Sequence, residues 1–124
     1  MIYSPVFEML KKYEKLNISR FHMPGHKGDG ILFGGLGAEL VKLDVTELDS
    51  TDNLLNPKGA FLEAQSLLAK KAKAHKSFIV TAGATCGNQA MILGLLGEGE
   101  KIIVDRNCHI SVFSALALSG AVPA

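Results

Sequence analysis

Apolar residues recur at helical spacing in four stretches of the chain. The first stretch holds Val6, Leu10 and Tyr13 behind a Ser-Pro pair typical of a helix start, and it predicts a short amphipathic helix. The other predicted helices span residues 59–75, 85–96 and 109–120. Gly97 follows the helix at 85–96, and Gly120 ends the helix at 109–120, as is common at helix ends.

Short β-branched runs separate these helices. "SFIVTA" at 77–82 and "KIIVD" at 101–105 have the length and composition of buried strands, and "AVPA" at the end resembles the start of a third. Helices alternating with buried strands predict an α/β fold, in which a parallel sheet is flanked by helices. We expect 77–82 and 101–105 to be neighbouring parallel strands.

Residues 20–57 are predicted to be irregular, because Pro24-Gly25, Gly34-Gly35 and Asn56-Pro57 are turn signals. The predicted organisation is an N-terminal helix with an irregular segment over 1–57, followed by an α/β part over 58–124. Within the irregular segment, "FHMPGHKGD" carries His22 and His26. The Pro-Gly break between them prevents the helix that would bring their side chains together, so zinc binding is not expected. A solvated loop is the other interpretation.

Composition narrows the classes of function. Of the 124 residues, 48% are hydrophobic and 20% charged, and the formal net charge is +1. This balance is typical of an ordered protein and indicates no binding to nucleic acid or to an anionic membrane. Two cysteines are too few for a disulfide framework, so a cytoplasmic location is expected. The final "LSGAVPA" resembles the approach to a strand, and we expect a longer protein.

The first candidate for chemistry is the turn "TAGATCGN" at 81–88, where a predicted strand passes directly into a helix. Ligands bind beyond the carboxyl ends of strands in open α/β sheets. Gly83 permits a tight turn, and the N–H groups of Ala84, Thr85 and Cys86 would be available at the helix N-terminus, with the Thr85 hydroxyl as a further donor. The pattern indicates a phosphate-binding turn. The alternative is a tight connection whose small residues serve packing.

The second candidate is His109, which follows the predicted strand 101–105. It is expected at the same edge of the sheet as the 81–88 turn. A lone histidine is also compatible with a packing or surface role. His109 is therefore a candidate for a functional site mainly because the anion-binding turn is expected beside it.

Four motifs in order resemble the major family of ornithine/lysine/arginine decarboxylases: "FHMPGHKG", "DVTELDSTDNLLNPKGAFLEAQ", "TAGATCGNQAM" and "VDRNCHISVFSALALSGAVP". The resemblance covers the chain from Arg20 onward. It implies the aspartate-aminotransferase-like fold, pyridoxal 5'-phosphate as cofactor, and decarboxylation of a basic amino acid to a diamine or agmatine, a step of polyamine biosynthesis. A homodimer or a higher homo-oligomer is implied as well.

The family's functional residues carry over where they match. Its phosphate-binding turn typically reads Asn-Gly-Thr-Ser/Thr, whereas this chain has Ala82-Gly83-Ala84-Thr85. Ala84 therefore offers only its backbone N–H, Thr85 keeps a hydroxyl, and Cys86 adds a neighbouring amide. The family's ring-stacking histidine corresponds to His109, which is thus implied in both cofactor binding and catalysis. The "MPGHK" and "DVTEL" segments resemble family hallmarks near the active site or the dimer surface.

The resemblance also implies what lies elsewhere. The family's cofactor-binding lysine follows a histidine in a downstream Ser-x-His-Lys motif, whereas Lys27 belongs to the earlier Pro-Gly-His-Lys motif. The chain by itself is therefore expected to be inactive. Two alternatives remain: another enzyme of the same cofactor and fold, such as an aminotransferase or a β-eliminating lyase, and a non-catalytic paralogue or assembly subunit.

Overall fold

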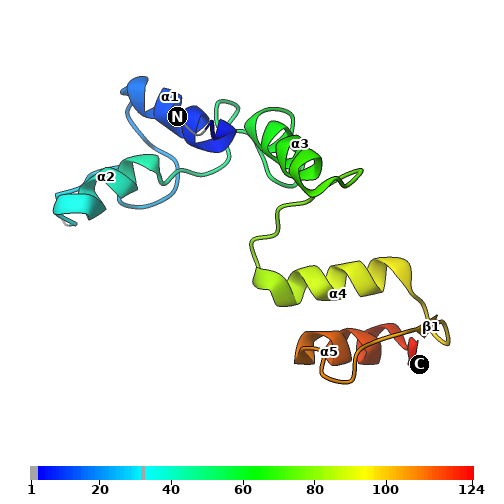
Figure 1. The fold of residues 1–124 in the computed structure, drawn as a ribbon. Coiled ribbons are helices and arrows are strands. Elements are labelled where there is room, and N and C mark those ends of the chain that lie inside the picture. The colour runs from blue at the N-terminus through cyan, green and yellow to red at the C-terminus, as the bar shows by residue number, and fades with distance from the viewer. Residues whose placement is uncertain (1–2, 32) are drawn as a thin grey trace. The chain divides into compact units, whose positions relative to one another are not determined.

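The computed structural model describes residues 3–31 and 33–124, and the chain divides into two compact units, Met1–Phe78 and Ile79–Ala124 (Figure 1). The described residues of the first unit form helices joined by loops. Those of the second form two helices and a small parallel sheet. The predicted α/β class with parallel strands is confirmed.

Helix α1 (Pro5–Lys15) packs against α2 (Gly35–Leu43) and α3 (Ala60–Ala72). Pro5 opens α1 as predicted, although the side chain of Ser4 makes no capping hydrogen bond. Tyr13 of α1 and Ala69 of α3 are buried, with 2% and 7% of their surface exposed. The apolar residues of α3 are not all buried: Leu68, which stands at helical spacing with Phe61 and Ala72, is 49% exposed.

The prediction that residues 20–57 are wholly irregular is wrong, because α2 lies inside this segment. Three glycines at positions 34, 35 and 37 disfavour a helix and read as turn signals. The helix is stabilised instead by packing against α1, since α2 contacts α1 and its Val41 is buried. Tertiary contacts usually provide most of a short helix's stability.

The second unit contains α4 (Gly83–Leu95) and α5 (Ile110–Ser119), which lie side by side and run in the same direction (Figure 1). Both follow the predicted positions. Ile92, Ala115 and Leu116 are buried in this unit. Gly120 ends α5 in the left-handed conformation, with φ of 71°, as its place after the helix predicted.

The sheet of the second unit pairs β1 (Lys101–Ile102) with β2 (Val122–Pro123). The two strands are parallel. Because β2 lies within the predicted "AVPA" segment, the prediction of a strand there is confirmed. The prediction of a strand at 77–82 is wrong for the described residues, and β1 is shorter than the predicted 101–105. A strand is defined by hydrogen bonds to a neighbour, and no described segment pairs with 77–82. The predicted domain boundary at 57/58 stays a prediction.

The side chain of Asp52 caps the N-terminus of α3. Asp52 lies seven residues before Gly59, the N-cap position of this helix. Asp52 has a positive φ of 64°, a conformation that aspartate tolerates. Its carboxylate accepts four backbone hydrogen bonds of 2.9–3.0 Å, from the N–H groups of Asn53, Lys58, Gly59 and Phe61. Burial alone would raise the pKa of Asp52, but these hydrogen bonds outweigh it and lower the pKa to about 2.

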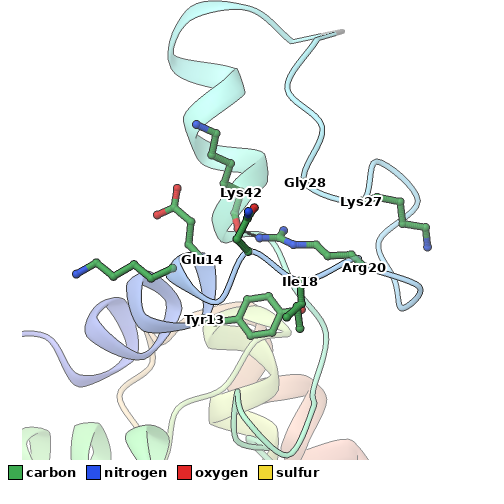
Figure 2. Close-up of a pocket in the computed structure, with 9 residues that line it drawn as sticks. Tyr13, Glu14, Ile18, Arg20, Lys27, Gly28 and Lys42 are labelled. Carbon is green, nitrogen blue, oxygen red and sulfur yellow. Dashed lines mark hydrogen bonds between the residues drawn. The ribbon is translucent and has the colours of Figure 1, made fainter.

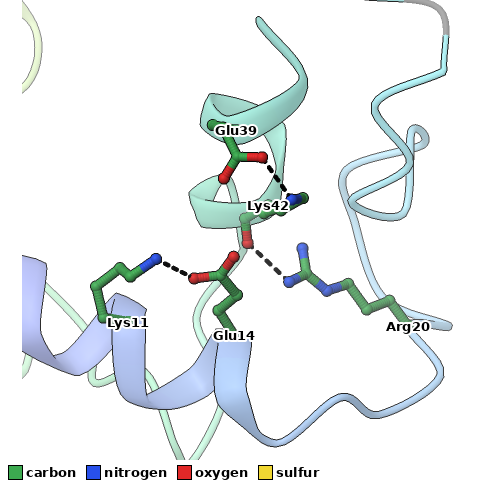
Figure 3. A network of polar contacts seen from close by, with 5 residues as sticks. All are labelled: Lys11, Glu14, Arg20, Glu39 and Lys42. Carbon is green, nitrogen blue, oxygen red and sulfur yellow. Dashed lines mark hydrogen bonds and ion pairs between the residues drawn. The ribbon is translucent and has the colours of Figure 1, made fainter. Parts of the chain in front are cut away.

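Arg20 joins α1 to α2 (Figure 3). Its Nη2 donates to the backbone oxygen of Lys42 at 2.7 Å, and its guanidinium lies 5.2 Å from the ring centroid of Tyr13. Two surface ion pairs flank it: Lys11 with Glu14, and Lys42 with Glu39. The hydrogen bond from Lys11 lowers the pKa of Glu14 below its ordinary value.

Candidate functional site

The predicted phosphate-binding turn forms the start of α4. Gly83 is the first residue of the helix and has φ of 80°, a conformation that glycine adopts without strain. The preceding residue, Ala82, provides no side-chain cap, and the first turn contains no acidic residue. Ala84 and Thr85 are exposed, while Cys86 is half-buried. Because the first-turn amides lack partners within a helix, this end is open to an anion.

The predicted ring-stacking residue, His109, is the N-cap of α5 and is exposed. The backbone N–H of Ser111 donates to Nδ1 of His109 at 3.2 Å, so this nitrogen carries no proton. The hydroxyl oxygen of Ser111 lies 2.9 Å from the same nitrogen and donates to it. A neutral imidazole with Nδ1 as acceptor carries its proton on Nε2. His109 therefore presents an N–H donor on its outer side.

A hydrogen bond between the two helices brings these features together. Nδ2 of Asn88, on α4, donates to Oγ of Ser111, on α5, at 2.8 Å. Asn88 lies one turn after Thr85, and Ser111 lies in the first turn of α5. Since α4 and α5 run in the same direction, the open end of α4 and His109 lie at the same end of the helix pair (Figure 1).

Sequence reasoning missed Asn88 and Ser111, although a signal was present. Asn88 follows Thr85 by three residues, which puts both on one face of the predicted helix, and Ser111 lies in the first turn of the helix that follows His109. Ser111 is 1% exposed, so its hydroxyl is a buried polar group between the two helices. Only the packing of α4 on α5 reveals that the two side chains meet.

The histidines of the "FHMPGHK" stretch serve the local structure of the first unit. Nδ1 of His22 donates to the backbone oxygen of Met23, and Nε2 of His22 accepts from the Tyr13 hydroxyl, both at 2.5 Å. Nδ1 of His26 accepts from the Gly28 N–H at 3.1 Å, and its Nε2 lies 3.2 Å from Asp44. His26 thereby ties the "MPGHK" segment to the "DVTEL" segment.

A hollow of about 500 Å³ lies between this stretch, α1 and α2 (Figure 2). Three of the cationic side chains that line it are engaged elsewhere: Arg20 with the backbone of Lys42, Lys42 with Glu39, and Lys27 with the backbone oxygen of His22. Nη1 of Arg20 is buried and lacks a hydrogen-bond partner among the described residues. It packs against Gly28, where an added Cβ would lie only 2.5 Å from it. This arrangement supports the loop and leaves Nη1 out of a ligand's reach.

Within the described part of the chain, no group of three histidine, cysteine or acidic side chains is arranged to hold a metal ion. Among those same residues, no helix has both the length and the apolar composition needed to cross a membrane.

Comparison with known proteins places the chain in a family. Residues 4–124 match the family described as Orn/Lys/Arg decarboxylase, major domain, so the chain belongs to that family. It is 40% identical over 123 residues to the uncharacterized protein YaaO of Bacillus subtilis, covering 97% of this chain and 26% of that protein. It is 36% identical over 124 residues to the arginine decarboxylase of Halalkalibacterium halodurans, covering 97% of this chain and 25% of that enzyme.

A solved structure agrees with this assignment. The constitutive lysine decarboxylase of E. coli superposes with a TM-score of 0.77 at 28% identity, over 98% of this chain and 19% of that one. The family predicted from the four motifs is confirmed. The chain spans about a quarter of the length of the first curated relatives that it matches.

Proposed function

We propose that this chain is the N-terminal part of a pyridoxal-phosphate-dependent decarboxylase that acts on lysine, ornithine or arginine and releases a diamine or agmatine. Family membership supports the reaction class, since several similar proteins are named as arginine, lysine or ornithine decarboxylases. The observation that carries the proposal is the pairing of an uncapped, open helix start with a histidine at the neighbouring helix start, linked through Asn88 and Ser111.

The start of α4 suits the phosphate group of the cofactor. The backbone N–H groups of Gly83, Ala84, Thr85 and Cys86, with the Thr85 hydroxyl, would hold it. The first turn carries no acidic side chain to repel an anion, and a Cβ built on Gly83 would meet nothing within 4 Å. The helix dipole adds about 0.3–2 kcal/mol in favour of a negative charge there.

His109 would lie against the cofactor ring and donate from Nε2 to the substrate carboxylate. When bound, the cofactor withdraws electrons from the substrate carbon so that carbon dioxide can leave. His109 orients the two partners, and its exposed ring has the flat apolar faces that stacking requires. The lysine that carries the cofactor would come from outside this chain, so the chain alone would be inactive. We further propose a cytoplasmic homo-oligomer.

Replacing His109 tests this assignment in the holoenzyme. Loss of stacking removes about 0.5–1.5 kcal/mol, so His109→Ala should weaken cofactor binding only several-fold. The fall in kcat should be much larger, because ring and substrate orientation decide which bond breaks. His109→Phe should restore cofactor occupancy but not kcat. Wild-type kcat in both variants would contradict the assignment.

The reaction products distinguish the decarboxylase from another enzyme of the same fold. Carbon dioxide and a diamine or agmatine support the decarboxylase, whereas a keto acid or ammonia indicates an aminotransferase or a lyase of the same fold. A non-catalytic paralogue is favoured by one feature, the alanine at position 84 where the family turn has a hydroxyl-bearing residue. Purified protein that binds the cofactor and turns over none of the three amino acids would select this second candidate.

A further inference from the structure

We propose that Ser111 and Asn88 are positioning residues that hold His109 with Nδ1 as a hydrogen-bond acceptor and Nε2–H facing the substrate. This inference rests on the proposed function of His109. It assigns a role to two side chains outside the cofactor cradle, and it predicts that they act on turnover through the imidazole rather than through direct contact with the cofactor.

The directions of the hydrogen bonds are compatible with one tautomer of His109. A serine hydroxyl has a single proton, and Oγ of Ser111 already accepts from Nδ2 of Asn88 at 2.8 Å. Its proton is therefore free to point at Nδ1 of His109, 2.9 Å away. The Ser111 N–H points at the same nitrogen at 3.2 Å. Two donors converge on Nδ1, so the Nε2–H tautomer is selected.

The tautomer matters for the proposed chemistry. A carboxylate is only an acceptor, so the ring nitrogen that meets it must carry a proton. The opposite tautomer would present a lone pair to the substrate carboxylate and repel it. Selection of the Nε2–H form before substrate arrives is thus an orientation effect of the kind that raises turnover.

Burial makes the arrangement stiff. Ser111 is 1% exposed, and a flip of the His109 ring about its Cβ–Cγ bond would leave the serine hydroxyl and N–H without their acceptor. Unsatisfied buried donors are disfavoured. Asn88, in the second turn of α4, anchors the hydroxyl from the neighbouring helix. The network therefore fixes the ring plane as well as the proton.

Kinetics of the holoenzyme test the role. Removing the partner that orients a working histidine costs about 10–100-fold at metal sites, and we expect the low end here, about tenfold in kcat for Ser111→Ala. Cofactor occupancy should change less than about twofold, because among the described residues the hydroxyl of Ser111 bonds His109 and Asn88 alone. Asn88→Ala leaves the serine–histidine bond in place and should lower kcat less. Ser111→Thr, which keeps a hydroxyl, should recover most of the rate.

Ser114→Ala is the matched control. Ser114 lies on the same helix, but among the residues that the structure describes its hydroxyl bonds only the backbone oxygen of Ile110, at 3.0 Å. Its kcat should equal that of the wild type. In a His109→Phe background, Ser111→Ala should have no further effect on kcat, because the ring through which it acts is gone. Equal losses with and without His109 would show a general structural role and overturn the proposal.

The tautomer itself is a second readout, independent of activity. Nitrogen NMR of the histidine-labelled holoenzyme, with the His109 signal identified by its loss in His109→Phe, should show a protonated Nε2 and an accepting Nδ1. Ser111→Ala removes the hydroxyl donor at 2.9 Å and keeps only the longer backbone N–H contact at 3.2 Å, so the share of the Nε2–H form should fall, and an unchanged signal would overturn the inference. Wild-type kcat in His109→Phe would instead refute the proposed function while the NMR result still stood.

Discussion

Asp52→Asn removes the charge from the carboxylate that caps α3 while keeping its size. In the wild type, Oδ1 accepts from Asn53 and Lys58, and Oδ2 accepts from Gly59 and Phe61. The amide of the variant has only one oxygen, so its NH2 group must face one of these pairs of N–H donors. Two of the four hydrogen bonds are lost, and the remaining two lose their charge assistance.

The expected loss of stability follows from the pKa of Asp52. Its value of about 2, against an ordinary value of 3.8, corresponds to about 2.4 kcal/mol between the charged and neutral forms. The side chain is half-buried, so solvent screens part of this energy and about 1–2 kcal/mol is expected. Loss of a helix cap has a similar cost, about 0.5–2 kcal/mol.

Amide hydrogen exchange of the whole protein, followed by mass spectrometry on peptides covering residues 58–63, measures this directly. A loss of 1–2 kcal/mol should accelerate local exchange by about 5–30-fold. Asp49→Asn is the matched control, because Asp49 is exposed and makes no side-chain hydrogen bond among the described residues. Exchange in Asp52→Asn within twofold of the control would refute the assignment of Asp52 as the cap.

The same cap predicts a pH dependence. The folded-state pKa of Asp52 lies below its unfolded value, so the stabilisation is complete above pH 3.8. It should decline as the pH falls from 3.8 toward about 2 and be absent below that value. Protection of the α3 N-terminus, corrected for intrinsic exchange rates, should show this decline in the wild type. A decline of equal size in Asp52→Asn would mean that other groups cause it.

Two further predictions concern the cofactor and the N-terminal loops. Thr85→Val should weaken pyridoxal phosphate binding about ten- to hundredfold, because a charge-assisted hydrogen bond of about 1.5–3 kcal/mol is lost. Ala84→Thr should have the opposite effect, and equilibrium titration measures both affinities. Unchanged affinity in Thr85→Val would contradict the assignment of the phosphate-binding turn. Residues 20–57 expose Phe21 and Leu55 by 93% and 92%, so this segment should exchange quickly in the 124-residue chain alone and slowly in the whole protein. Strong protection in the chain alone would show that it needs no further partner.

The local sequence was sufficient for the helices whose signals are local. Pro5 marks the start of α1, Gly120 marks the end of α5, and the good helix formers of α3 predict it to within a residue or so at its start. The open turn at Gly83 was also readable, because small residues without a capping side chain are visible in the sequence itself. These features depend on residues a few positions apart, whose interactions depend little on the rest of the fold.

Other features depended on contacts between distant residues. Helix α2 forms despite its glycines because α1 covers it, and 77–82 is no strand because no described segment pairs with it. Asp52 has a positive φ and bonds the N–H of Gly59, the N-cap of α3, seven residues later in the chain. The tautomer of His109 is decided by Ser111 and Asn88, of which Asn88 lies 23 residues before Ser111 and on another helix. Propensity and periodicity carry no information on such contacts, which arise only when the helices pack.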